Sequence, residues 1–237
     1  FLYIFAMLEG TERTANMIKI FYTFCILISF LTTTVYAVPS TFPTIQSATK
    51  TFDFTTGEWV LTGNVTAQTE NWEAKADYVR IHPINLTVQA SGNVTLTTRG
   101  VYIQADRVTL NSQQQVADLS GNLKISFDAI RATASSGTYH LKNKTADLFG
   151  EITLSPPSGG FINSHSAHFT LADRKVIFTS PIEFELYKEH SGSGISGHAL
   201  SGDYSLLGEK ATFSQVTYHT IPSGVDTSVD TLSYSSK

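Results

Sequence analysis

The sequence ASGNVTLTTRGVYIQADRVTL, residues 90–110, decides the fold because its pattern recurs at a fixed spacing. Its Gly92-Asn93-Val94 triplet has near copies at 63–65 and 121–123, and a worn copy, one residue late, lies at 178–182. Four glycines stand at a constant step of 29 residues: Gly63, Gly92, Gly121 and Gly150. Repeats of this size indicate stacked supersecondary units, each of which buries its apolar face against the next.

Within each unit, apolar residues alternate with polar ones, which is typical of a half-buried β-strand. Val94 and Leu96 alternate with threonines, and the alternation shifts by one residue after Ala105. The same shift follows an alanine in the neighbouring units, next to Asp77 and Ser135. Such a shift predicts a β-bulge or a corner at this point. Each unit is therefore expected to form two or three short strands, apolar inside and polar outside.

The N-terminal region predicts export. Residues 17–37 begin with a methionine, contain one lysine before an apolar run, and end in Val35-Tyr36-Ala37. This arrangement is typical of a secretory signal peptide cleaved after Ala37, and residues 1–16 are interpreted as a translated upstream region. A retained membrane anchor is the alternative, because the apolar run approaches the roughly 20 residues that a spanning helix needs.

Composition limits the partners and the covalent links to be expected. A formal net charge of −4 over 237 residues offers no basic field for nucleic acid, so no nucleic-acid partner is expected. The single cysteine, Cys25, lies in the predicted signal peptide, so no disulfide is expected in the exported chain. With 41% hydrophobic residues the chain can bury a core, and its stability must come from sheet and core packing.

The repeats divide the exported chain into two parts. A repeat domain is expected over 38–186, with an insertion at 155–160 and with polar residues at inward positions soon after it. Residues 187–237 are expected to hold a degenerate β repeat and a flexible C-terminal tail. A Gly/Ser/His-rich loop or linker is expected near 190–202, and one or two final strands near 211–221.

The repeated motif, L-x-G-N-V followed by I-x-A-D-x-V-x-L, resembles the OstA-like domain shared by the lipopolysaccharide-transport protein LptA and the N-terminal part of LptD. The resemblance covers residues 55–186 and rests on 61–81, 90–110, 119–141 and 148–154. It implies an all-β fold: an elongated, open β-jelly roll of antiparallel strands whose inner face holds lipid acyl chains. Ser135 departs from the motif, which has aspartate at that position.

The resemblance also implies a function and partners. The chain would be a periplasmic protein that binds lipopolysaccharide through its lipid A. It would join other OstA-like transport proteins, and further copies of itself head to tail, in a bridge between the membranes. The inner-face residues expected to bind lipid are Val65, Trp72, Ile81, Val94, Leu96, Ile103, Val108, Leu123, Ile125 and Phe127. The competing interpretation is that these residues fill a closed β core and contact no ligand.

Other chemistry finds little support. His165 and His168 are close in sequence, but residues three apart in a strand point to opposite faces, so no metal site and no cofactor are expected. No catalytic residue is predicted. Asp77 and Asp106 stand one repeat apart and would suit a β-solenoid enzyme acting on surface polysaccharide, although a structural aspartate at a turn explains them better.

Four hypotheses therefore remain: a periplasmic lipid carrier, a membrane-anchored partner of the same fold similar to LptC, a β-solenoid enzyme, and a structural repeat protein of the cell surface. The carrier is favoured. Its association would use the open edges of the sheet, and a first strand is expected around 49–61, where few charges block pairing.

Overall fold

The computed structural model describes residues 44–70, 72–98, 101–127, 130–170, 173–188 and 192–236. The predicted signal peptide and the region before it lie outside these residues. Within the described part of the chain, no helix is long and apolar enough to cross a membrane.

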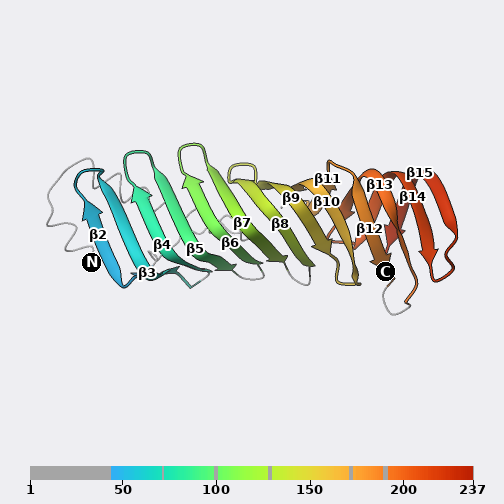
Figure 1. Cartoon of the computed structure of the whole chain (residues 1–237), viewed down its shortest axis with the longest axis horizontal. Coiled ribbons are helices and arrows are strands. Elements are labelled where there is room, and N and C mark those ends of the chain that lie inside the picture. The colour runs from blue at the N-terminus through green and yellow to red at the C-terminus, as the bar shows by residue number, and fades with distance from the viewer. Residues whose placement is uncertain are drawn as a thin grey trace.

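The described residues form one elongated 15-stranded sheet in which every pair of neighbouring strands is antiparallel (Figure 1). The strands are β1 (Thr44–Gln46), β2 (Thr49–Asp53), β3 (Glu58–Gln68), β4 (Trp72–His82), β5 (Thr87–Thr98), β6 (Val101–Asn111), β7 (Val116–Phe127), β8 (Ile130–His140), β9 (Thr145–Ser155), β10 (Gly160–Thr170), β11 (Lys175–Phe178), β12 (Ile182–Tyr187), β13 (Gly194–Ser205), β14 (Lys210–Ile221) and β15 (Asp226–Ser235). From β3 to β11 and from β12 to β15, strands that follow each other in sequence are neighbours in the sheet. β1 and β2 both pair with β3, and β11 and β12 both lie between β10 and β13, so each of these pairs is one interrupted strand.

Each 29-residue unit is a hairpin of two strands of 11 or 12 residues, longer than the two or three short strands expected. The hairpin turns at 54–57, 83–86, 112–115 and 141–144 keep the 29-residue step. The last residue of each turn has a positive φ, at Gly57, Leu86, Gln115 and Lys144. The antiparallel pairing rules out a β-solenoid for the described residues, because a solenoid stacks its strands in parallel.

A β-bulge at each Gly-Asn pair lets these long strands bend without ending. In β5, Gly92 and Asn93 together stand opposite Asp106 of β6, because the register runs from Ser91–Arg107 directly to Val94–Ala105. Gly92 and Asn93 both have positive φ angles, of 75° and 48°. The extra residue shifts the alternation by one and increases the local bend. The corner therefore lies where the sequence predicts it, and its extra residue is in the strand facing the Ala-Asp pair.

The bulge glycine is required because the neighbouring strand crosses very close to it. A Cβ atom on Gly92 would lie 2.5 Å from Oδ2 and 2.8 Å from Cβ of Asp77 on β4. The Asn93 side chain donates a 2.8 Å hydrogen bond to Asp77, and Asn122 does the same to Asp106. Ser135 keeps the contact where the motif aspartate is missing, since its hydroxyl accepts a 3.3 Å bond from the Glu151 backbone N–H.

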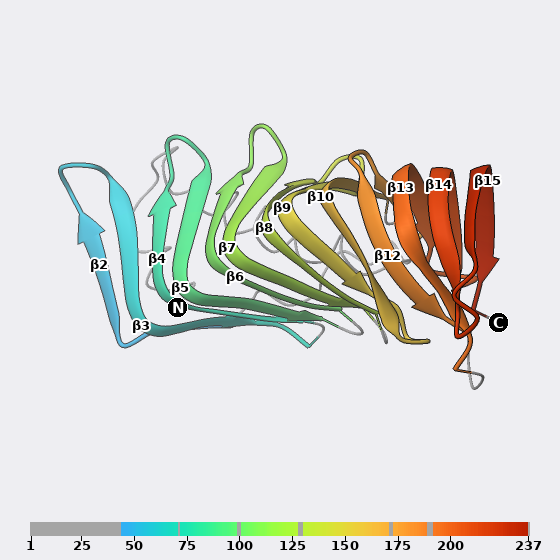
Figure 2. The same ribbon diagram turned by 45° about the vertical axis from the view of Figure 1, so that its right-hand side comes forward.

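The corners fold the sheet along its length into two arms that face each other. Figure 2 shows strands β3 to β9 bending sharply. One arm consists of the strand segments between the hairpin turns and the corner, and the other arm consists of the segments on the far side of the corner. The inward faces of both arms are apolar. Three small residues stand at the corner itself: Ala76, Ala105 and Ala134, each at most 6% exposed. Small side chains at this line leave space between the two arms.

The C-terminal third is closed rather than open. Its interior is filled by large side chains from β10 to β14, including Phe178, Phe184 and Phe213, each at most 1% exposed. The rings of Phe184 and Phe213 stack with their centroids 4.3 Å apart. The sheet therefore has a dense core at this end and a separate, smaller cluster of buried residues toward β1.

The structure differs from the sequence-based expectations at both ends. Residues 194–202, part of the loop or linker expected near 190–202, belong to β13, and much of the expected flexible tail forms β15, which pairs with β14 along its length. The expected first strand at 49–61 is interrupted by the turn at 54–57. The Gly/Ser-rich composition suggested a loop, but the glycines of β13 instead allow the neighbouring strand β14 to pass close by. A Cβ on Gly197 would lie 2.7 Å from Cα of Tyr218.

After the 155–160 insertion, a pair of serines places hydroxyl groups in the core. Ser164 stands at the inward corner position and is 6% exposed, but its hydroxyl lies 2.7 Å from the hydroxyl of Ser180. Ser180 sits in the break between β11 and β12, at the worn fifth copy of the motif. The pair satisfies both hydroxyls within a closed core.

Candidate functional site

A long apolar trough between the two arms is the main concave feature of the described residues. Its open space is about 1940 Å³, including the part open to solvent, and it runs from Ile45 on β1 to Leu206 after β13. One wall comes from the arm next to the hairpin turns and carries Leu61, Ile81 and Val108. The other wall comes from the arm beyond the corner. Apolar surface on this scale is unusual on a soluble protein without a ligand or partner.

Most of the predicted inner-face residues line this trough. Nine of the ten are in its walls: Val65, Ile81, Val94, Leu96, Ile103, Val108, Leu123, Ile125 and Phe127. Trp72 is the exception, because its buried ring packs with Ala67 against Ile45, Ala74 and Leu96 and is not among the lining residues. That these nine side chains bind lipid stays a prediction.

The trough also contains residues that the sequence reasoning did not select. They include the residues two before each bulge glycine, at Leu61, Ala90, Leu119 and Leu148, and several aromatic or aliphatic residues toward its end, such as Val176, Phe169 and Phe178. The first group was visible in the sequence, since it shares the 29-residue step. In the second group, Phe178 belongs to the worn copy of the repeat, whereas Phe169 and Val176 lie outside the repeated motif and only the folded sheet brings them to the trough.

The trough ends at the closed C-terminal core. Its last lining residues are Phe169, Val176, Phe178 and Leu206, and the stacked Phe184 and Phe213 lie in the filled interior beyond them. At the other end the lining reaches Ile45 on the edge strand. The two alternatives raised by the sequence, a lined trough and a filled core, are therefore both present, in different parts of the same sheet.

Polar groups are rare in the trough. Lys75 contributes to the lining, but its ammonium group forms a 2.9 Å ion pair with the exposed Glu73. Tyr139 also lines the trough; its hydroxyl is buried, and burial raises the pKa of Tyr139 to about 12. Near the closed end, the guanidinium of Arg174 lies 5.2 Å from the centre of the Phe127 ring. A trough of this chemistry suits hydrocarbon, because apolar surface leaves water favourably at about 25 cal/mol per Å².

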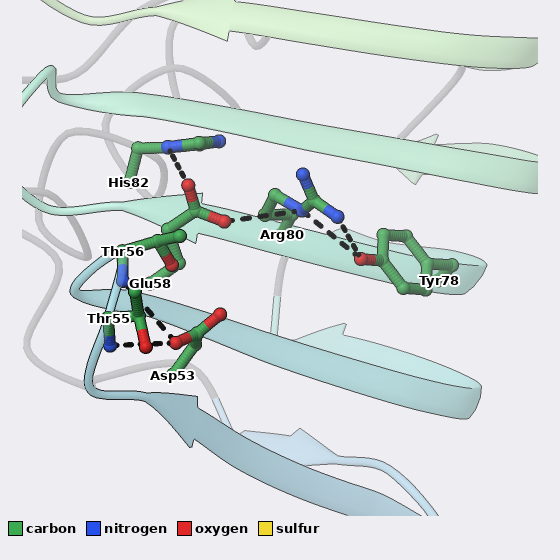
Figure 3. Close-up of polar contacts among 7 residues, drawn as sticks. All are labelled: Asp53, Thr55, Thr56, Glu58, Tyr78, Arg80 and His82. Carbon is green, nitrogen blue, oxygen red and sulfur yellow. Dashed lines mark hydrogen bonds and ion pairs between the residues drawn. The ribbon is translucent and has the colours of Figure 1, made fainter.

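Polar side chains gather instead outside the trough, near the β2 edge (Figure 3). Glu58 accepts from His82 Nδ1 at 2.9 Å and from Arg80 Nε at 3.4 Å. Arg80 in turn donates to the Tyr78 hydroxyl, at 3.1 and 3.0 Å. Asp53 caps the hairpin turn, and the backbone N–H of Thr55 is the main cause that holds its pKa below the ordinary value. These contacts cap the turn after β2 and join β3 to β4, which indicates a structural role.

A second polar group crosses β8, β9 and β10. Asp147 lies 2.7 Å from His168 Nδ1 and 3.1 Å from His140 Nε2. All three side chains are more than a third exposed. Across the described residues, no group of three or more His, Cys, Asp or Glu side chains is arranged to hold a metal ion.

The Asp147 contacts predict a pH dependence of stability. The hydrogen bond from His168 is the main cause that lowers the pKa of Asp147 below its ordinary 3.8. A lowered folded-state pKa stabilises the protein above the unfolded-state value, and this contribution is lost as the pH falls through the folded value. Asp147→Asn should therefore destabilise by less than about 1 kcal/mol at pH 6, since the group is partly exposed. Urea unfolding of both proteins from pH 6 to pH 2 should show the difference disappear below pH 3.8; a constant difference would contradict this origin.

The two aspartates considered for catalysis are corner residues. Asp77 and Asp106 each accept a hydrogen bond from the asparagine of the facing bulge. Each aspartate hydrogen-bonds to the bulge that faces it rather than to the other aspartate. Their position in the repeat follows from the geometry of the corner, as the structural interpretation of the sequence predicted.

Part of this chain matches a known protein family. Residues 44–167, more than half of the chain, match the model of a family described as LptA/(LptD N-terminal domain) LPS transport protein. Comparison with curated proteins finds no match. A similar solved structure is LptH, the LptA homologous periplasmic component of the lipopolysaccharide transport device from Pseudomonas aeruginosa, at 11% identity and a TM-score of 0.39, covering 45% of this chain and 81% of that one. On the extent of the family match, the chain belongs to the family of LptA and LptD N-terminal domain lipopolysaccharide transport proteins.

Proposed function

We propose that this protein binds lipopolysaccharide in the periplasm by taking lipid A acyl chains into the trough, and passes it between proteins of the same fold on the way to the outer membrane. The observation that carries the proposal is the apolar lining of the trough, which runs from Ile45 to Leu206 and is open to solvent. The family match supports the lipid class, since the family is one of lipopolysaccharide transport proteins.

The energetics favour such a site. Moving an acyl chain from water to an apolar site is favourable by about 0.8 kcal/mol per buried CH₂. A chain of about twelve carbons therefore represents roughly 10 kcal/mol of gross transfer free energy. A carrier needs an apolar surface of comparable size, or the lipid would not leave a membrane. The inward Val, Leu and Ile residues of the repeated hairpins provide that surface, and the sugars and phosphates stay at the open side in water.

The repeat itself supports movement along the trough. A single deep binding site would hold the lipid, whereas equivalent residues at a 29-residue step, such as Val65 and Val94, offer similar contacts in successive hairpins. A lipid that slides from one hairpin to the next therefore replaces its contacts with similar ones. The closed core beyond Phe178 limits this movement to the part of the sheet from β1 to β11.

Site-specific photocrosslinking in cells tests the proposal. A crosslinking residue at Leu96 or Ile103, both in the trough walls, is expected to capture lipopolysaccharide. Matched controls lie one residue away on the same strands, at Thr97 and Tyr102, whose side chains are exposed. The controls should give at most a few per cent of the signal, because a neighbour in a strand points to the opposite face. Equal capture at inward and outward positions, or none at either, would reject the proposal.

The membrane-anchored alternative concerns residues outside the described part of the chain. The proposed carrier has its signal peptide removed, so N-terminal sequencing of the exported protein is expected to begin at Val38. Retention of residues 17–37 would instead favour a partner similar to LptC.

Association with other copies or other OstA-like proteins would use the edges of the sheet. β2 pairs only with β3, and β15 pairs only with β14, so each has one side without a neighbouring strand within the described residues. Unpaired edges of this kind accept a further strand. Two different edges meeting head to tail form a heterologous contact, which extends without closing. Sedimentation over a concentration series measures this association.

A further inference from the structure

Tyr139 lines the trough and carries a buried hydroxyl whose hydrogen-bonding capacity the described residues leave unused. Tyr139 on β8 lines the trough and is 8% exposed. Its hydroxyl oxygen is buried and has no hydrogen-bond partner among the described residues, which holds for no other lining residue. Leaving a buried hydroxyl unpaired costs about 1–3 kcal/mol, so folding alone gives no reason to place it there.

The repeat makes the position distinctive. The equivalent inward pairs of the two preceding hairpins are aliphatic, Val79 with Ile81 and Val108 with Leu110. In the third hairpin the pair is Gly137 with Tyr139. The one polar inward position in this series therefore interrupts an otherwise hydrocarbon wall.

The neighbours of Tyr139 allow its ring to reach the trough. On β7 the residue paired with Tyr139 is Ala117, and on β9 it is Ala146. Gly137 lies two residues before it on the same strand and adds no side chain. Its ring lies in the same buried cluster as Leu110 and Leu141 and lines the trough beside these small neighbours. Because burial raises the pKa of Tyr139 to about 12, the hydroxyl keeps its proton at neutral pH and can donate it.

We propose that the Tyr139 hydroxyl donates a hydrogen bond to an oxygen atom carried by the bound acyl chain, so that this part of the trough selects oxygen-bearing chains over plain alkyl chains. The acceptor is either the carbonyl oxygen that links the chain to its head group or a hydroxyl group on the chain itself. This inference rests on the proposed lipid-binding function and adds a specificity-determining residue to it. An apolar wall alone discriminates chains weakly, whereas a buried polar group discriminates strongly against a ligand that leaves it unpaired.

Tyr204 provides a matched control within the same protein. Its hydroxyl is also buried without a partner among the described residues, and burial raises its pKa as well. Tyr204 lies in the closed core and does not line the trough. Tyr139→Phe and Tyr204→Phe thus remove the same group from two buried sites, and only the first change alters a residue that lines the trough. Both variants should fold and be at least as stable as the wild type, since each loses an unpaired hydroxyl.

Binding is measured with three amphiphiles that share a quaternary ammonium head group and a twelve-carbon chain, below the concentrations at which they form micelles. Dodecyltrimethylammonium has no oxygen, dodecanoylcholine has an ester carbonyl, and the third carries a hydroxyl on the third carbon of the plain chain. Tyr139→Phe is expected to weaken binding of at least one oxygen-bearing amphiphile about tenfold and to leave dodecyltrimethylammonium within about twofold. Which of the two loses affinity identifies the acceptor. Tyr204→Phe should change none of them.

Two results would overturn the inference in distinguishable ways. If the wild type binds all three amphiphiles and Tyr139→Phe changes their affinities equally, Tyr139 does not select oxygen, and the proposed lipid trough stands. If the wild type binds none of them, and inward crosslinkers capture no lipopolysaccharide, the proposed function and this inference both fail.

Discussion

Replacing Ile125 with aspartate is expected to abolish lipid binding and to leave the fold intact. Ile125 lines the trough from β7 and is only partly buried, so the new side chain can reach solvent in the free protein. An acyl chain laid against it would remove water from a carboxylate that has no partner, at a cost of several kcal/mol. A loss of about 3 kcal/mol already weakens binding roughly a hundredfold. Lipopolysaccharide binding to the purified variant, followed by crosslinking at Ile103, measures the effect.

Ser126→Asp is the matched control for this variant. It introduces the same charge one residue later on β7, where the side chain points away from the trough, beside Arg131 of β8. The control should bind lipopolysaccharide within about twofold of the wild type, because solvent and salt screen the interactions of a charge on that face. Equal losses in both variants would indicate a general charge effect and contradict the placement of the lipid. Retained binding by Ile125→Asp would contradict it directly.

Gly92→Ala is expected to lower the free energy of unfolding by about 3–5 kcal/mol. The new Cβ would lie 2.5 Å from Oδ2 of Asp77, a distance that real Cβ atoms do not tolerate. The left-handed backbone at φ 75° adds about 1–2 kcal/mol for a residue with a side chain. Moving Asp77 away would also break its 2.8 Å hydrogen bond with Asn93, worth about 1 kcal/mol. Denaturant unfolding of the purified protein measures the change.

Gly224→Ala separates the two causes. Gly224 has a similar φ of 68°, but nothing lies within 4 Å of a Cβ built there. Its alanine variant should lose only the backbone contribution, about 1–2 kcal/mol. If the two variants lose the same stability, the close approach of Asp77 is unimportant, and the constant glycine step reflects backbone conformation alone.

Much of the trough was predictable because both β-strand alternation and the repeat are local in sequence. Val94, Leu96 and Ile103 fall in its walls because residues two apart in a strand share a face. Trp72 is buried but does not line the trough, since alternation selects the inward face but not which inward residue meets the open space. The unpaired hydroxyl of Tyr139 also depends on its surroundings. The sequence shows the tyrosine and the small residues beside it, but not that every possible partner lies out of reach.

The repeated 29-residue pattern was enough to predict repeated β-strand units, their corners and the class of fold. A glycine is required where a neighbouring strand passes close to a bulge, and alternation marks the buried face of each strand. Only the tertiary structure decided where the interior is open and where it is closed. Gly/Ser-rich residues 194–205 belong to the closed core because their glycines let neighbouring strands approach, as at Gly197 and Tyr218. Phe184 and Phe213 lie 29 residues apart, yet their stacking depends on how β12 and β14 are brought together in the closed core. Closure depends on packing between residues distant in sequence, and a local pattern does not specify that packing.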